Sequence, residues 1–332
     1  MDETATAPTG TQSHEGRDQD EDMRELHLRA GSRGIVPTPP YELRLTPEDA
    51  GWDYSGLAVV TLAPREYHEL NTEASELVVL SLGGGCTVQV TDADGAHHEF
   101  VLQGRAGVFA GVSDMVYVPR EARMRLHSPG GGSFALPSAR CHRRLEPRYR
   151  PAEEVPVELR GAGNCSRQVH NFCSADSFPA DRLIAVEVLT PAGNWSSYPP
   201  HKHDETTEHE IELEEIYYYQ VSVPVDTRGA PMTTVTTSDP LAYQRVYGTT
   251  ERPIDVLAEV RSGDVILIPH GWHGPSMATP GHHLYYLNVM AGPGPERAWR
   301  ICDDPAHGWV RETWQQQALD PRLPLFDPEW EE

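Results

Sequence analysis

Short apolar runs separated by polar turns dominate the chain from residue 25 onward. In the first half the runs are LAVVTLA, ELVVLSLGGGCTVQVT, HEFVLQG, DMVYVP and ARMRLHS, bounded by glycine, proline or aspartate. The second half repeats the pattern with RLIAVEVLT, IYYYQVSV, LAYQRVYG, DVLAEV, DVILIP and HLYYLNVMAG. Their length and their β-branched and aromatic residues predict strands, whereas helical periodicity is weak. The chain is therefore predicted to be all-β, built as sandwiches or barrels.

The length and an internal similarity predict two domains. A chain of 332 residues is long enough for two domains of about 150 residues each. Each half has a glycine-containing turn before an apolar strand that ends in proline, GRAGVFAGVSDMVYVP and VRSGDVILIP, which indicates duplication of one barrel. We predict an acidic disordered tail over 1–24, a first barrel over 25–145, an inter-domain connection over 146–178, a second barrel over 179–310 and a C-terminal tail over 311–332.

Composition narrows the range of partners. The formal net charge of -23 disfavours binding to nucleic acid or to an anionic membrane, because both need clustered positive charge. No stretch has the roughly 20 consecutive apolar residues of a membrane helix and no secretory signal opens the chain, so we expect a cytoplasmic protein. The five scattered cysteines without a CxxC predict neither a disulfide framework nor a thiolate zinc site.

Histidines in the second half point most directly to chemistry. In PPHKHD, the alternation of side chains along a strand places His201 and His203 on one face, within reach of one cation. The following LEEIYYY has two adjacent carboxylates, of which only one points inward, and we choose Glu215 because it opens the apolar run. The return strand GDVILIPHGWHGP then supplies His273, with His270 as the alternative on the same turn.

Three neutral imidazoles and one carboxylate suit a single divalent ion. Zinc or manganese is expected first, with iron, cobalt or nickel as alternatives, and positions stay open for water or substrate. The first half has no comparable set of ligands, so the first barrel is predicted to lack a metal. His68, His97, His98 and His127 in this half form no comparable set.

The order G…HxH…E followed by GD…P.G.H is similar to the two cupin motifs and implies a bicupin, a protein of two cupin barrels. The matching residues are Gly193, His201, His203, Glu215, Gly263, Asp264, Pro269, Gly271 and His273. Two departures are visible: DETTEHEIELE lengthens the gap before Glu215, and the second motif is one residue short before His273. We expect the insert to form a loop at the barrel mouth.

More specifically, GNWSSYPPHKHD, YQRVYG, LYYLNVMAGP and RAWRICDDPAHGWV resemble the 5-deoxy-glucuronate isomerase family of bacterial inositol catabolism, over residues 25–328. The resemblance implies interconversion of 5-deoxy-D-glucuronate, a small acidic sugar, with 5-dehydro-2-deoxy-D-gluconate. A related ketol-isomerase of pectin breakdown is the nearest alternative, and an iron-dependent cupin dioxygenase would use the same ligand types. A sugar-binding regulatory cupin is a non-enzymatic alternative, although no helix-turn-helix pattern accompanies the barrels. A homodimer is a plausible assembly.

The implied isomerisation requires a general base that carries a proton between neighbouring carbons. The sequence leaves this group open among Glu187, Glu214, His270, Tyr286 and a metal-bound hydroxide, of which the hydroxide is preferred.

The substrate carboxylate requires a cation, and an arginine can hold it through two parallel hydrogen bonds. We expect Arg245 in YQRVYG to take this role, with Arg167 as second choice. Lys202 is a third candidate, because it is the only lysine of the chain and lies inside the metal motif. Strand alternation, however, directs its side chain away from the two histidines.

Overall fold

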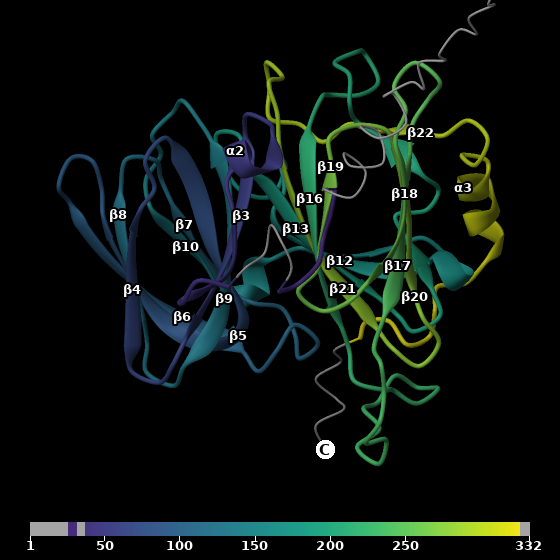
Figure 1. Ribbon diagram of the computed structural model, residues 1–332, viewed down its shortest axis with the longest axis horizontal. Coiled ribbons are helices and arrows are strands. Elements are labelled where there is room, and N and C mark those ends of the chain that lie inside the picture. The colour runs from purple at the N-terminus through teal and green to yellow at the C-terminus, as the bar shows by residue number, and fades with distance from the viewer. Residues whose placement is uncertain (1–25, 32–36, 326–332) are drawn as a thin grey trace, which may run out of the picture.

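The structure is a computed structural model that describes residues 26–31 and 37–325, and it consists of two barrels side by side (Figure 1). The all-β prediction is confirmed, because strands make up most of the regular structure. The tail predicted to be disordered, 1–24, lies outside the described residues. The helical segments are short: α2 Pro47–Ala50, η1 Ala152–Glu154, η2 Gly163–Cys165, α3 Val310–Thr313 and η3 Trp314–Gln316. None of these described helices has the length and apolar content needed to cross a membrane.

The first barrel is a nine-stranded sheet that closes through one long strand, β5. The first part of β5 pairs with β7 and β9, and its second part pairs with β6 and β8. The strand bends at Gly84, whose φ is 90° and where a Cβ atom would lie 2.5 Å from the Gly131 carbonyl oxygen, so only glycine fits. The strands are β2 Tyr41–Leu45, β3 Ser55–Leu62, β4 Glu66–Asn71, β5 Ser75–Thr91, β6 His97–Arg105, β7 Met115–Val118, β8 Arg123–Ser128, β9 Gly132–Arg140 and β10 Arg148–Arg150.

The second barrel combines a seven-stranded and a six-stranded sheet. The larger sheet has the order β1-β19-β16-β21-β13-β12-β11, and the smaller contains β18-β17-β20-β15-β22 with β14 paired to β20. The strands are β1 His27–Leu28, β11 Val157–Arg160, β12 Arg167–Cys173, β13 Ile184–Thr190, β14 Trp195–Ser196, β15 His201–Lys202, β16 Glu214–Val221, β17 Ala242–Tyr247, β18 Asp255–Val260, β19 Val265–Ile268, β20 Trp272–Ala278, β21 Leu284–Ala291 and β22 Cys302–Asp303.

The structure differs from the sequence prediction at the domain boundaries. Residues 146–178, predicted as a connection, contain three strands: β10 pairs with β7 of the first barrel, whereas β11 and β12 extend the sheet of the second. Strand β1, from the segment assigned to the first barrel, pairs with β19 of the second. The segment RQVHNFC in β12 is almost wholly buried, so its polar residues have tertiary partners that no local pattern shows.

One face of each large sheet packs against the other barrel. Along β16, Ile216 and Tyr218 belong to the apolar core shared by the two barrels, whereas Tyr217 and Tyr219 belong to the interior of the second barrel. Strand β5 alternates in the same way, with Val78 facing the shared core and Val79 the interior of the first barrel. Both strands are buried on two faces, which explains their nearly continuous apolar runs.

A carboxylate of the first barrel holds the backbone of the second. Glu76, at the start of β5, is fully buried. Its side chain accepts hydrogen bonds from the backbone N–H groups of Asp181, Arg182 and Leu183 at 2.9, 2.6 and 2.7 Å, and from the Tyr117 hydroxyl at 2.6 Å. These three N–H groups lie just before β13, so Glu76 fixes where this strand enters the second barrel.

The reciprocal contact runs from the second barrel to the first. Glu214, at the start of β16, accepts from the backbone N–H groups of Asp53, Tyr54 and Ser55 at 2.8, 2.9 and 2.8 Å. These residues lead into β3 of the first barrel. Two carboxylates at equivalent places therefore bind the two barrels together, and Glu214 directly precedes Glu215, one of the predicted metal ligands.

We predict that Glu76→Gln lowers the free energy of unfolding by about 2–3 kcal/mol, because hydrogen bonds to a charged acceptor are lost and an amide NH₂ meets buried donors. Urea denaturation measures the change. The exposed Glu251→Gln serves as control and should stay within about 0.5 kcal/mol of the wild type. Equal stability of the two variants would contradict the role of Glu76.

Candidate active site

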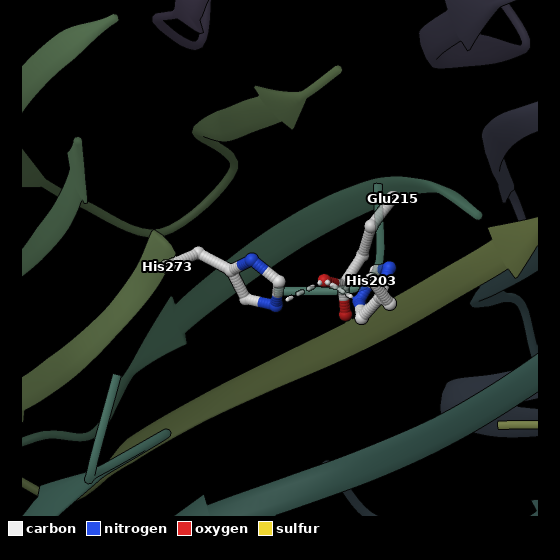
Figure 2. Close-up of side chains that lie close together, drawn as sticks. All are labelled: His203, Glu215 and His273. Atoms are coloured by element: carbon white, nitrogen blue, oxygen red, sulfur yellow. Dashed lines mark hydrogen bonds and ion pairs between the residues drawn. The ribbon is translucent and has the colours of Figure 1, made fainter. Parts of the chain in front are cut away.

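Three of the four predicted metal ligands converge inside the second barrel. His203, Glu215 and His273 are buried, and their ligand atoms all lie within 4.8 Å of one another. Figure 2 shows both imidazoles directed at the Glu215 carboxylate. The Nε2 atoms of His203 and His273 each lie 3.1 Å from the same oxygen, Oε2. His203 follows β15, Glu215 lies in β16 and His273 in β20, so both sheets contribute to the group.

The turn before β20 decides between the two alternative histidines. Gly271 has a φ of 92°, and a Cβ atom there would lie 2.8 Å from the Tyr247 carbonyl oxygen. The strand that begins at Trp272 then points His273 inward. His270 precedes the turn, outside both the ligand group and the lining of the adjoining cavity. The structure therefore brings His273, and not His270, to Glu215.

His201 lies beside this group. It is the direct strand partner of His273, and the centroids of the two rings are 4.4 Å apart. Burial holds the pKa of His201 well below its ordinary value, so the ring is neutral and can act as a ligand. His201 also lines the adjoining cavity, which places it between the ligand group and the space available to a substrate.

Backbone carbonyls fix the tautomer of all three rings. The Nδ1 atoms of His201, His203 and His273 lie against carbonyl oxygens at 3.4, 3.2 and 3.1 Å. Because a carbonyl oxygen can only accept, each Nδ1 carries the hydrogen and donates it. A neutral ring then has its lone pair on Nε2, the atom that His203 and His273 direct at Glu215.

This arrangement requires a positive charge between the imidazoles and the carboxylate. Burial raises the pKa of Glu215, but the neighbouring His273 and the hydrogen bond from His203 outweigh burial and hold that pKa well below its ordinary value. His273 Nε2 has no hydrogen-bond partner among the described residues, although the ionised carboxylate is 3.1 Å away. Lone pairs directed at an anion repel it unless a cation lies between them, and this donor set fits a divalent metal ion.

The remaining oxygen of Glu215 is held by the protein. Asn288, on the neighbouring strand β21, donates its side-chain N–H to Oε1. Burial lowers the pKa of His203, but the hydrogen bond to Glu215 overcomes this effect and raises it. Without a metal ion, a proton on Nε2 of His203 supplies the positive charge beside Glu215. A bound metal ion would supply this charge instead.

A cavity of about 410 Å³ adjoins His201. Its charged lining consists of Arg160, Arg167, Arg311 and Asp303. Three guanidinium groups against one carboxylate make this cavity locally positive in a chain with a formal net charge of -23. The cavity therefore suits a small anion.

The three arginines differ in whether their charge is compensated. Arg311 pairs with Asp303, and Arg160 pairs with Glu158 at 2.7 Å. Arg167 is 5% exposed, has no carboxylate partner among the described residues, and donates only to two backbone carbonyls, at 3.0 and 3.4 Å. Burial lowers the pKa of Arg167 to about 10, so it stays charged at neutral pH. Arg167 is thus the buried cation in this cavity that lacks an anion.

Two tyrosines form another wall of the cavity. The rings of Tyr217 and Tyr286 are stacked, with centroids 5.0 Å apart and planes inclined by 7°. The Tyr286 hydroxyl donates to the Ser196 hydroxyl at 3.0 Å. Burial raises the pKa of Tyr286 to about 12, so this phenol can donate a hydrogen bond but is a poor general base at neutral pH.

The structure places Glu187, one of the candidates for the catalytic base, outside the cavity. Its side chain lies on the face of β13 that is turned toward the first barrel, where it pairs with Arg105 and accepts from the Tyr285 hydroxyl at 2.8 Å. His170 lies 3.0 Å away on the same side. Burial raises the pKa of Glu187, but Arg105 and His170 outweigh burial and hold it at about 2. Glu187 is therefore part of the junction between the barrels and does not line the cavity.

Lys202 was a candidate to bind the substrate, but in the structure it pairs with acidic residues of the protein. Its Nζ atom lies 2.7 Å from Asp204 and 2.6 Å from Glu210, both in the insert that separates the HxH motif from Glu215. Asp204 in turn accepts from the Gly271 N–H at 2.9 Å, next to the turn that precedes His273. Lys202 thus anchors the unusually long insert, because strand alternation points it away from the ligands.

Arg245, the first choice for the substrate carboxylate, lies outside the cavity lining. It pairs with Asp255 on the neighbouring strand β18. Of the three predicted substrate-binding residues, the structure places only Arg167 in the cavity. Arg160 and Arg311 were missed, and only the family-like string RAWRICDDPAHGWV, which ends just before Arg311, gave a signal for that region.

Two packed barrels, one of which holds a buried cluster of histidines and a carboxylate, define a two-domain cupin. The oxalate decarboxylase of Lactobacillus farciminis shares this fold, with a TM-score of 0.59 at 12% identity over 89% of this chain and 90% of that one. The bicupin prediction is confirmed.

The chain belongs to the KduI/IolB family, whose model matches residues 37–310. The 5-deoxy-glucuronate isomerase of Geobacillus kaustophilus is 39% identical over 289 residues, covering 85% of this chain and 96% of that protein. A solved structure of an IolB-like protein from Salmonella typhimurium has a TM-score of 0.73 at 30% identity, over 86% of this chain and 98% of that one. The family resemblance read from the sequence is confirmed.

We predict that Glu187→Gln lowers the free energy of unfolding at pH 7 by about 3 kcal/mol, because Arg105 loses its buried counter-ion. The folded-state pKa is about 2 against 4.5 for the free group, so this stabilisation is present above pH 4.5 and is lost as the pH falls toward 2. Urea denaturation at pH 7 and pH 3 should show the difference between variant and wild type shrinking. The pH profile of turnover should stay unchanged, and a shifted profile would restore Glu187 as a catalytic group.

Proposed function

We propose that this chain is a metal-dependent 5-deoxy-glucuronate isomerase that converts 5-deoxy-D-glucuronate, an aldose, to 5-dehydro-2-deoxy-D-gluconate, a ketose. The observation that carries the proposal is the convergence of imidazole lone pairs and an ionised carboxylate beside a cavity with an uncompensated buried arginine. The names of relatives such as the Geobacillus kaustophilus enzyme support the substrate. A ketol-isomerase acting on a related uronate is the second candidate, because the family description covers KduI as well as IolB.

The proposed ligands of one divalent ion are His201, His203, Glu215 and His273. Nitrogen donors with one carboxylate favour zinc, and manganese is the alternative. When bound, the ion supplies a Lewis acid for the carbonyl and the neighbouring hydroxyl of the sugar. The carbonyls behind each Nδ1 keep the rings in the ligating tautomer, so the protein is organised for the ion in advance.

Arg167 holds the substrate carboxylate in this proposal. Its guanidinium is buried and charged. Two parallel hydrogen bonds to the substrate carboxylate would compensate this charge, for which the described residues supply no carboxylate. The carboxylate then fixes one end of the open sugar chain, so that the aldehyde end is directed to the ligand group. Positioning of this kind contributes to rate because the reacting atoms are held in place.

The reaction removes a proton from C2 and returns one to C1, while the O–H hydrogen of C2 is lost and the C1 oxygen gains one. The protonated phenol of Tyr217 is suited to donate a hydrogen bond to a sugar oxygen, since burial raises its pKa. Its contact with the Ser197 hydroxyl, at 3.1 Å, leaves this hydrogen available when Ser197 is the donor.

We predict that the purified, metal-loaded protein consumes the aldehyde of 5-deoxy-D-glucuronate and that His203→Ala lowers turnover by more than about 100-fold. Metal content, measured by mass spectrometry of the protein, should fall in parallel, because one of the ligands is lost. His209→Ala changes an exposed histidine of the insert and should keep both metal and activity.

The same assay separates the competing functions. No turnover by the wild type would refute the substrate, and full activity of the metal-poor His203→Ala variant would refute the role of the metal. Turnover of a 4-deoxy-5-keto-uronate alone would favour the second candidate. Consumption of oxygen would indicate a dioxygenase in place of an isomerase.

We predict that Arg167→Met raises KM for 5-deoxy-D-glucuronate by about 100-fold, the effect of losing a buried charge-assisted contact. Arg167→Lys should recover part of the loss, since it restores the charge but not the planar fork. Arg245→Met is the matched control, because Arg245 pairs with Asp255 outside the cavity. Steady-state kinetics measures KM, and an equal rise in both methionine variants would refute the assignment.

A further inference from the structure

We propose that Val169 and Val188 form an apolar wall that selects a substrate with no hydroxyl group on the carbon next to its carboxylate. This inference rests on the proposed function and concerns how the site distinguishes 5-deoxy-D-glucuronate from D-glucuronate, which differs from it only by a hydroxyl group on C5. The wall is the pair of valine side chains that line the cavity.

The register of the sheet places this wall beside the arginine. Val169 and Val188 are direct partners across β12 and β13. Val169 follows Arg167 by two residues on β12, so both side chains are on the same face of the sheet, and both line the cavity. The two valines are 2% and 6% exposed, so a ligand group resting on them would be shielded from solvent.

The chemistry of the substrate matches this order of groups. In 5-deoxy-D-glucuronate the carboxylate carbon, C6, is bonded directly to C5, which is a methylene. A carboxylate held by Arg167 therefore brings C5 next to the valine pair, where apolar surface meets apolar surface. A C5 hydroxyl would give up its bound water there and face two isopropyl groups, which neither donate nor accept hydrogen bonds.

Polar groups near the wall are already engaged. Tyr286, the partner of Val188 on β21, donates its hydroxyl to Ser196. The neighbouring Thr190 also donates to Ser196, at 2.6 Å. An added hydroxyl on the substrate would have to compete with these contacts, so the wall disfavours it in the bound state.

If the two valines had only a structural role, changing them would have a different effect from the one expected for a selective wall. As members of the barrel core they would affect stability when changed, but they would not alter the preference between two substrates. The decisive quantity is therefore the ratio of kcat/KM for 5-deoxy-D-glucuronate to kcat/KM for D-glucuronate. D-glucuronate closes into a six-membered ring through its C5 hydroxyl, but this property belongs to the substrate in solution and cancels when variants are compared.

The experiment measures this ratio for the metal-loaded wild type and for Val169→Thr and Val188→Thr. Threonine keeps the branched shape of valine and adds a group that can hydrogen-bond to the C5 hydroxyl. We expect each change to narrow the ratio about tenfold, within the range by which pockets distinguish a single hydroxyl. Val188→Ala, which makes room for a water molecule, should narrow the ratio in the same direction and serves if the threonine variants do not fold.

The control is Val186→Thr, on the same strand and side as Val188 but outside the cavity lining. It should leave the ratio unchanged. If the wild type is active but neither wall variant alters the ratio, or if Val186→Thr narrows it equally, the wall is refuted while the isomerase function stands. If the wild type does not turn over 5-deoxy-D-glucuronate, the proposed function fails and the wall fails with it.

Discussion

The structure depends on a geometric constraint, the alternation of side chains along strands that are buried on both faces. At the start of β16 this constraint separates two adjacent carboxylates: Glu214 holds the backbone of the first barrel, and Glu215 faces the imidazoles of the second. The alternation continues with Ile216 in the shared core and Tyr217 in the wall of the cavity. One strand therefore couples the junction between the barrels to the candidate metal site, and neither can shift without the other.

Buried charged groups have protein partners at the junction between the barrels, whereas some of those at the candidate site do not. Glu76, Glu187 and Glu214 at the junction are satisfied by N–H groups, hydroxyls or a guanidinium of the opposite barrel. Glu215 instead faces imidazole nitrogens whose tautomer leaves lone pairs, and Arg167 has no carboxylate partner among the described residues. Buried groups left uncompensated cost stability, so their presence at one place marks where a metal ion and an anion are expected to bind.

Much of the site was accessible from the sequence because it lies in short, local patterns. The HxH spacing indicated that His201 and His203 share a face, and the apolar run after LEE indicated that Glu215 points inward. The sequence could not show the long-range partners of the other residues. Lys202 binds acids of the insert, Arg245 binds Asp255, and the strands within 146–178 pair with elements of both barrels.

The sequence by itself determined the all-β class, the duplication of the barrel, the family and the residues that share each face of the predicted strands. The tertiary structure alone decided which of those faces looks into the cavity. In IAVEVLT every position is buried. Strand alternation shows that Glu187 and Val188 lie on opposite faces, but it does not show which of the two faces the substrate. Packing against the first barrel decides which face looks into the cavity. Arg105 of the first barrel pairs with Glu187, so the opposite face of the strand, with Val188, lines the cavity together with Arg167.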